Sequence, residues 1–173
     1  MYTRIPGALD RSGVYFNDTP AEEIAGDIAC MNRIHRNKVN VNRFRWCAFG
    51  EPFAVTKDID KIHTIAKLLP NVQFWIPTRA WRKTALRMKI ERGIMLEDNV
   101  RIMASIDPSN TERELNTLGR WRTMFFGDND RHPLSVSAFK CPKTFQKGGP
   151  VTCKNCEGGC FNPTTRHIHL KKH

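Results

Sequence analysis

A dense group of cysteines lies in the carboxy-terminal part of the chain. Four of the six cysteines have the spacing C-x11-C-x2-C-x3-C, namely Cys141, Cys153, Cys156 and Cys160. A C-x2-C step lets two thiolates face one ion, and the glycines at 158–159 permit the tight turn that brings in a third sulfur. The Gly-Gly-Pro turn at 148–150 can return the remote Cys141 as a fourth ligand. Thiols crowded this closely favour a metal site over disulfides.

The chemistry of these ligands narrows the choice of metal. Four soft sulfur ligands suit Zn²⁺ or an iron–sulfur cluster, whereas Mg²⁺ and Ca²⁺ take oxygen ligands. Three close cysteines and one remote Cys–Pro are the layout of ferredoxin-type runs, so a [4Fe–4S] cluster is slightly favoured over zinc. Three histidines could each replace a cysteine as ligand: His167, His169 and His173. Because apolar residues alternate with them, a short strand is the favoured interpretation of this segment.

The charge balance points to an anionic partner. The chain has 173 residues, enough for a single domain over 1–173, and a formal net charge of +11. Such an excess favours nucleic acid or a host nucleic-acid machine as partner, because Lys and Arg neutralise phosphates. The basic residues cluster at 33–45, 79–92 and 166–173. The candidate nucleic-acid-binding residues are Arg33, Arg36, Lys38, Arg82, Lys83 and Arg87.

No stretch of the sequence directs the chain to a membrane. The longest apolar runs fall short of the roughly 18 residues that a membrane span needs. The first residues have no hydrophobic signal core, so we expect a cytoplasmic protein.

Strand and helix patterns alternate along the chain. Apolar or aromatic runs predict strands at 43–49, 72–76, 100–106 and 134–139. Helical patterns begin near residue 20 and cover 58–69, 79–92 and 112–121. This order predicts an α/β fold with a small, mostly parallel sheet or a partial barrel. We divide the domain into an amino-terminal segment with its helix (1–42), an α/β core (43–140) and a Cys-rich metal-binding tail (141–173).

The residues that follow the predicted strands form a second candidate site. Glu51, Thr78–Arg79, Asp107 and Lys140–Cys141 each come directly after a strand. Because the carboxyl ends of parallel strands meet at one edge, we expect these residues to gather there, beside the cysteine cluster. Arginine would hold an anionic group, and a carboxylate would serve as acid, base or metal ligand. The candidate catalytic residues are therefore Glu51, Arg79 and Asp107, although no complete catalytic motif is present.

Two segments and the tail resemble a known family. The segment 44–53, which contains Phe49–Gly50–Glu51, and the segment 65–79, which ends in Thr78–Arg79, resemble bacteriophage proteins of the gene product 88 family. The tail is similar to that of the family in its Cys–Pro, its cysteine triplet and its Lys–Lys–His end. The resemblance implies a phage-encoded protein acting in the cytoplasm of an infected bacterium. The core also looks distantly like a radical-SAM type α/β core that lacks the SAM-cluster motif.

Two functions follow from these observations. The first is a metal-binding accessory protein, holding an iron–sulfur cluster or zinc, whose basic surface binds nucleic acid or a host nucleic-acid machine. The second is a metalloenzyme, with redox or phosphodiester chemistry at the strand edge. The remaining cysteines, Cys30 and Cys47, are interpreted as small core residues, and Trp46, Trp75 and Trp81 are also assigned to the core.

Overall fold

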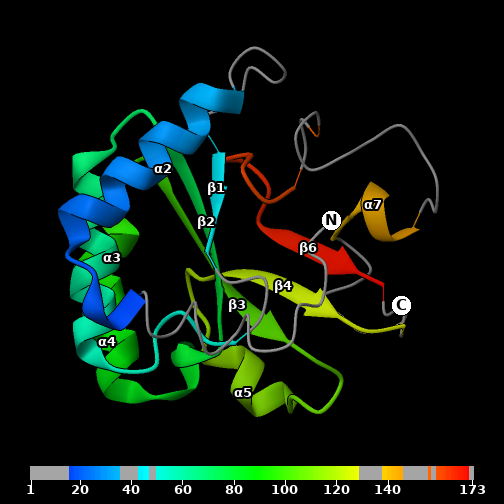
Figure 1. Cartoon of the computed structure of the whole chain (residues 1–173). Coiled ribbons are helices and arrows are strands. Elements are labelled where there is room, and N and C mark those ends of the chain that lie inside the picture. Colours follow the sequence, from blue (N-terminus) through cyan, green and yellow to red (C-terminus); the bar gives the residue numbers. More distant parts are fainter. Residues whose placement is uncertain are drawn as a thin grey trace, which may run out of the picture.

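The computed structural model describes residues 16–35, 43–46, 50–128, 138–145, 156 and 159–171, without the side chains of 32–35 and 143. Within these residues, one sheet contains six strands in the order β1-β2-β3-β4-β6-β5, and all neighbouring strands are parallel. The sheet curls into a half-barrel (Figure 1). This confirms the prediction of an α/β fold with a parallel sheet or partial barrel. None of the described helices has the length and apolar character that a bilayer crossing requires.

The elements have the following bounds. The strands are β1 (Arg43–Arg45), β2 (Gln73–Thr78), β3 (Val100–Ile106), β4 (Arg122–Phe126), β5 (Phe139–Lys140) and β6 (His167–Leu170). The α-helices are α2 (Ala21–His35), α3 (Thr56–Leu68), α4 (Thr84–Arg92), α5 (Glu112–Asn116) and α7 (Pro142–Phe145). Two 3₁₀ turns, η1 (Ala80–Arg82) and η2 (Ile94–Leu96), flank α4.

The two faces of the sheet are covered differently. Side chains such as Phe74 and Ile102 join the main core with residues of α2, α3 and α4, which lie along one side of the sheet (Figure 1). We call this the helix face. The opposite face, which we call the tail face, has its own cluster: Trp75, Met103, Met124 and Ile168 with Phe161 of the tail. No described helix adds a buried residue to that second cluster.

Several predicted elements differ in extent from those in the structure. The predicted helix 112–121 ends at Asn116, and Trp121 instead leads into β4, a strand that was not predicted. The interpretation of the histidine segment as a strand is confirmed by β6. Of the predicted strand 134–139, residues 134–137 lie outside the described part, and β5 continues to Lys140.

The predicted core is confirmed for three tryptophans and wrong for one cysteine. Trp46, Trp75 and Trp81 are all buried. Cys30 is exposed, because it lies on the side of α2 opposite to the buried Ile28. Cys47 lies outside the described residues.

One asparagine joins α3 to the first central strands. The Asn99 side-chain amide donates hydrogen bonds to the carbonyls of Ala66, Leu69 and Val72, at 3.0, 3.0 and 3.1 Å. The backbone carbonyl of Asn99 accepts a hydrogen bond from the Phe74 N–H at 2.8 Å. The end of α3, the start of β2 and the start of β3 are therefore held by a single side chain and its backbone.

We expect Asn99→Ala to lower the free energy of unfolding by about 2 kcal/mol, because the half-buried carbonyls lose their donor. Urea denaturation at neutral pH measures this loss. Asn71→Ala, at an exposed position in the turn before β2, is the matched control and should change stability by less than about 0.5 kcal/mol. Equal stability of the two variants would contradict the role given to Asn99.

Candidate functional site

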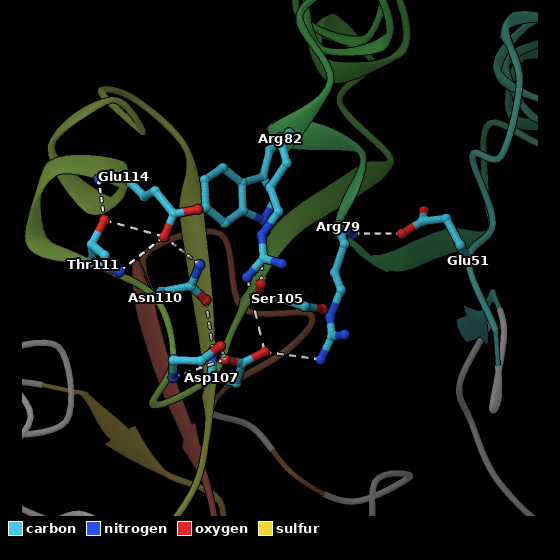
Figure 2. Close-up of polar contacts among 10 residues, drawn as sticks. Glu51, Arg79, Arg82, Ser105, Asp107, Asn110, Thr111 and Glu114 are labelled. Atoms are coloured by element: carbon cyan, nitrogen blue, oxygen red, sulfur yellow. Dashed lines mark hydrogen bonds and ion pairs between the residues drawn. The ribbon is translucent and has the colours of Figure 1, made fainter.

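Glu51 lies in the segment that follows β1, and its carboxylate is hydrogen-bonded to the end of β2. One of its carboxylate oxygens, Oε1, accepts hydrogen bonds from the Phe53 N–H at 3.1 Å and from the Thr78 hydroxyl. The other, Oε2, accepts from the backbone N–H of Arg79 at 2.5 Å (Figure 2). Both oxygens therefore have donors from the protein itself. In this arrangement Glu51 orders the loop.

Asp107 follows β3, and its carboxylate forms ion pairs with two arginines of the η1 region. Arg79 Nη2 lies 3.1 Å from Asp107 Oδ2, and Arg82 Nη2 lies 3.9 Å from the same oxygen (Figure 2). The other oxygen, Oδ1, accepts from the backbone N–H of Ser109 at 3.0 Å and from its hydroxyl. The Arg79 side chain is 59% exposed, whereas that of Asp107 is 21% exposed. Solvent therefore reaches the arginine more than the carboxylate.

These contacts set the charge of Asp107. The hydrogen bond from the Ser109 side chain holds the pKa of Asp107 below its usual value of 3.8, although partial burial opposes this. The charges of Arg79 and Arg82 lower that pKa further. Asp107 is therefore ionised at neutral pH, and it acts as an anion and not as a proton donor.

A hydrogen-bonded network supports Asp107 from α5. The Asp107 N–H donates to Asn110 Oδ1 at 3.0 Å, and Asn110 Nδ2 donates to Glu114 Oε2 at 3.2 Å. Glu114 also accepts from the N–H of Thr111 at 2.8 Å, while Thr111 caps the helix (Figure 2). Hydrogen bonds from Thr111 and Asn110 lower the pKa of Glu114. These hydrogen bonds therefore fix the loop after β3, the start of α5 and the carboxylate of Asp107 relative to one another.

The structure brings Glu51, Arg79 and Asp107 together as predicted, at the carboxyl ends of neighbouring strands. We call these residues and Thr78 the strand-edge cluster. Cys141 also follows its strand, β5, but β4 and β6 lie between β5 and β3. At about 4.8 Å per strand, the end of β5 is about 14 Å along the sheet from the end of β3. The cluster and Cys141 therefore share an edge without being adjacent.

The described cysteines of the tail lie around the tail face. Cys141 and Cys160 are half-buried against the cluster that contains Trp75 and Ile168. The carbonyl of Cys156 accepts a hydrogen bond from Arg43 Nη1 at 3.1 Å. Cys153 lies outside the described residues. Within the described part of the chain, no group of three or more His, Cys, Asp or Glu residues is arranged to hold a metal ion.

The histidines of β6 are engaged in strand packing. His167 Nδ1 lies 2.8 Å from the hydroxyl of Thr123, and burial, followed by the charge of Arg166, lowers the pKa of His167. His169 is fully buried, with Nε2 at 2.8 Å from the carbonyl of Gly127. His173 lies outside the described residues.

The predicted nucleic-acid-binding residues divide into three groups. Arg36, Lys38 and the side chain of Arg33 lie outside the described part. Arg82 and Arg87 are paired within the protein, with Asp107 and with Glu91, the latter at 2.8 Å. Lys83 is exposed.

Four arginines lie on the tail face: Arg43, Arg45, Arg101 and Arg122. Sequence reasoning placed the first two in the basic cluster 33–45 but did not identify the four as one set. We call them the tail-face arginines. None of the four forms an ion pair with an acidic residue of the described chain. The signal was present in the alternation of the strands, because a residue between two helix-face residues must point to the other face. Arg101, for example, lies between the buried Val100 and Ile102.

Two of these arginines stack on aromatic rings. Arg45 Cζ lies 4.5 Å from the centre of the Trp75 ring, and Arg43 Cζ lies 5.0 Å from that of Phe161. Phe161 in turn packs edge-on against Trp75, with ring centres 6.2 Å apart. Arginine and aromatic side chains are therefore interleaved on this face.

Comparison with known protein families gives a match that covers most of the chain. A family model described as Gene product 88 matches residues 10–158, which is most of the chain. The matched range covers the strand-edge cluster and Cys141, Cys153 and Cys156, and it leaves Cys160 and β6 outside. No curated protein and no solved structure gives a significant match.

We expect Asp107→Asn to lower the free energy of unfolding by about 1 kcal/mol at pH 7, because the ion pair with Arg79 is lost. The loss is modest because solvent screens the exposed arginine. A lowered folded-state pKa stabilises the protein above the ordinary value of 3.8, and this contribution is lost as the pH falls through the folded-state value. The difference between wild type and variant should therefore shrink below about pH 4. Urea denaturation at several pH values measures it. The control is Asp60→Asn, which removes a carboxylate whose exposed ion pair with Lys89 is screened by solvent. A difference that grows in acid would contradict this assignment.

Proposed function

Because the chain belongs to the Gene product 88 family, a family of bacteriophage proteins, we propose that it is an accessory protein of the infected cell. In this proposal it acts in the cytoplasm and binds nucleic acid, or a host machine that handles nucleic acid. Its cysteine-rich tail holds a metal centre.

The observation that carries this proposal is the difference between two sets of arginines. Arg79, Arg82 and Arg87 each lie within 4.0 Å of a carboxylate, so the protein supplies their counter-charge. The tail-face arginines have no acidic partner in the described chain. Unpaired arginines gathered on one face attract phosphates, and each contact releases counterions from nucleic acid. The net charge of +11 adds long-range attraction.

The interleaved aromatic rings support the same function. Trp75 is buried at 3% exposure and carries Arg45 on its ring, which fixes the guanidinium at the surface. Arg45 itself is exposed. A guanidinium held in this way loses little conformational entropy when it binds a phosphate.

The metal proposal is supported by the cysteine spacing and by the placement of the tail. Cys141 and Cys160 lie far apart in sequence but pack against the same cluster of the tail face. Both are soft donors, which fit an iron–sulfur cluster or zinc. A centre built from the four cysteines would fix the tail against the sheet, since metal binding and local folding are linked.

The second candidate is a metalloenzyme that uses the strand-edge cluster. It is favoured by the meeting of Glu51, Arg79 and Asp107 at the carboxyl ends of parallel strands. We rank it second, because Glu51 and Asp107 already accept hydrogen bonds on both oxygens. The resemblance to radical-SAM type cores stays an expectation from the sequence alone, and it assigns a role to no residue.

We expect the double variant Arg43→Gln/Arg45→Gln to bind a fluorescent single-stranded oligonucleotide about tenfold more weakly in anisotropy titrations. Its dependence of log Kd on log salt should be shallower by about 1 for each phosphate that the variant no longer neutralises. The matched control is Arg92→Gln/Arg113→Gln, which removes two exposed helical arginines and the same net charge.

The controls separate the two candidates. Arg79→Ala should leave oligonucleotide affinity within twofold, because Asp107 already pairs with this arginine. A large loss of affinity in Arg79→Ala alone would favour the strand-edge cluster instead. Binding by wild type that does not weaken with salt would contradict the proposal.

We expect the anaerobically purified protein to contain about four irons per chain, or about one zinc as the alternative. Metal analysis with an absorption spectrum decides between them. Cys156→Ser should lose most of the metal, whereas Cys30→Ser should keep it, because Cys30 is exposed on α2, away from the tail. A wild-type protein with neither metal would contradict the metal centre.

A further inference from the structure

Three buried N–H groups of the tail face have no hydrogen-bond partner among the described residues: Trp75 Nε1, Arg101 Nε and Arg122 Nη1. Burial of a donor without an acceptor is costly, and natural structures resolve it with a water, an ion or a ligand. Three such donors on neighbouring strands of one face can share one acceptor.

Strand register puts these residues side by side. Trp75 of β2 is the direct partner of Arg101 in β3. Arg122 of β4 is the partner of Met103, which follows Arg101 by two residues on the same face. The three donors therefore come from three adjacent strands, near the amino ends of β3 and β4.

Backbone carbonyls hold both guanidiniums in place. Arg101 Nη1 donates to the carbonyls of Asp98 and Val100, at 2.6 and 3.0 Å. Arg122 Nη2 donates to the carbonyls of Asn162 and Thr165 in the tail. These contacts fix the guanidiniums through some of their N–H groups and leave Arg101 Nε and Arg122 Nη1 over. A site held in this way is organised before any ligand arrives.

The charges at this position are unbalanced. Burial lowers the pKa of Arg122, the nearby charge of Arg101 lowers it further, and Cys160 opposes both effects. Two guanidiniums thus lie close enough to repel each other, and neither forms an ion pair within the described chain. An anion with more than one charge would relieve the repulsion.

We propose that Trp75 Nε1, Arg101 Nε and Arg122 Nη1 bind the phosphate group of a phosphate monoester, such as the terminal phosphate of a nucleic-acid strand or a free mononucleotide. This site deepens the proposed function, on which the choice of nucleic acid as the source of the phosphate rests. A phosphate monoester fits because it carries up to two negative charges and presents three oxygens to three donors. The three donor atoms are buried and Phe161 packs against Trp75, so the affinity of the site falls less with salt than that of surface phosphate contacts.

The test is a titration of the full-length ¹⁵N-labelled protein with inorganic phosphate, followed through the indole N–H signals of its four tryptophans. We expect the Trp75 signal, identified by its loss in Trp75→Phe, to move with saturation. The signals of Trp81 and Trp121 should stay in place, because their N–H groups already donate to Ser105 and Glu91. No movement of the Trp75 signal, or an equal movement with chloride at matched ionic strength, would overturn the proposal.

Substitutions provide the second readout. Arg101→Gln should weaken phosphate binding at least tenfold, and Arg113→Gln, at an exposed position of α5, should not change it. Arg101→Gln keeps the contacts of Arg122 with the tail, so the variant retains the fold on that side. Unchanged phosphate affinity in Arg101→Gln would also overturn the site.

Oligonucleotides with and without a 5′-phosphate distinguish the sources. Saturating movement of the Trp75 signal only with the phosphorylated strand assigns the site to a nucleic-acid end, and movement with a mononucleotide alone assigns it to a free nucleotide. Salt-dependent binding of unphosphorylated strands without a phosphate effect on Trp75 overturns this site but leaves the proposed function standing. Phosphate binding without oligonucleotide binding supports this site and overturns the proposed function.

Discussion

The parallel pairing of all six strands is the constraint on which the other features depend. It sends every strand's carboxyl end to one edge, which is why Glu51, Arg79 and Asp107 meet although they lie far apart in sequence. It also gives each strand two faces. Because the buried residues of α2, α3 and α4 join only the helix-face core, the other face is left to the tail and to arginines.

Much of the fold was predictable because β2 and β3 are almost continuous apolar runs, as strands buried on both faces must be. The strand-edge cluster followed from the same reasoning. By contrast, β4 was missed, because this strand of five residues begins directly after the predicted helix 112–121. The tail-face arginines were also not identified as one set. Until it is known which face of the sheet the helices cover, the sequence does not show whether an arginine within a strand lies on a covered face or on a solvent-exposed face.

The strand-edge cluster shows why convergence of acids and arginines differs from catalytic readiness. Glu51 and Asp107 are close to donors on every side, and those donors include backbone N–H groups that belong to the turns themselves. Carboxylates with filled acceptor positions stabilise loops. On the tail face the imbalance is the opposite, since buried donors there exceed the acceptors that the described residues offer.

The position of β6 between β4 and β5 has a consequence for the order of folding. Within the described sheet β5 pairs only with β6, so it has no place in the sheet until the later segment has docked on β4. That docking closes a loop from Thr123 to His167, a slow kind of step because a long chain must be ordered first. Cys141 follows β5 and Cys160 precedes β6, so both thiols become half-buried in the same late step. Until then they lack the packing contacts with the tail-face cluster that half-bury them in the folded protein.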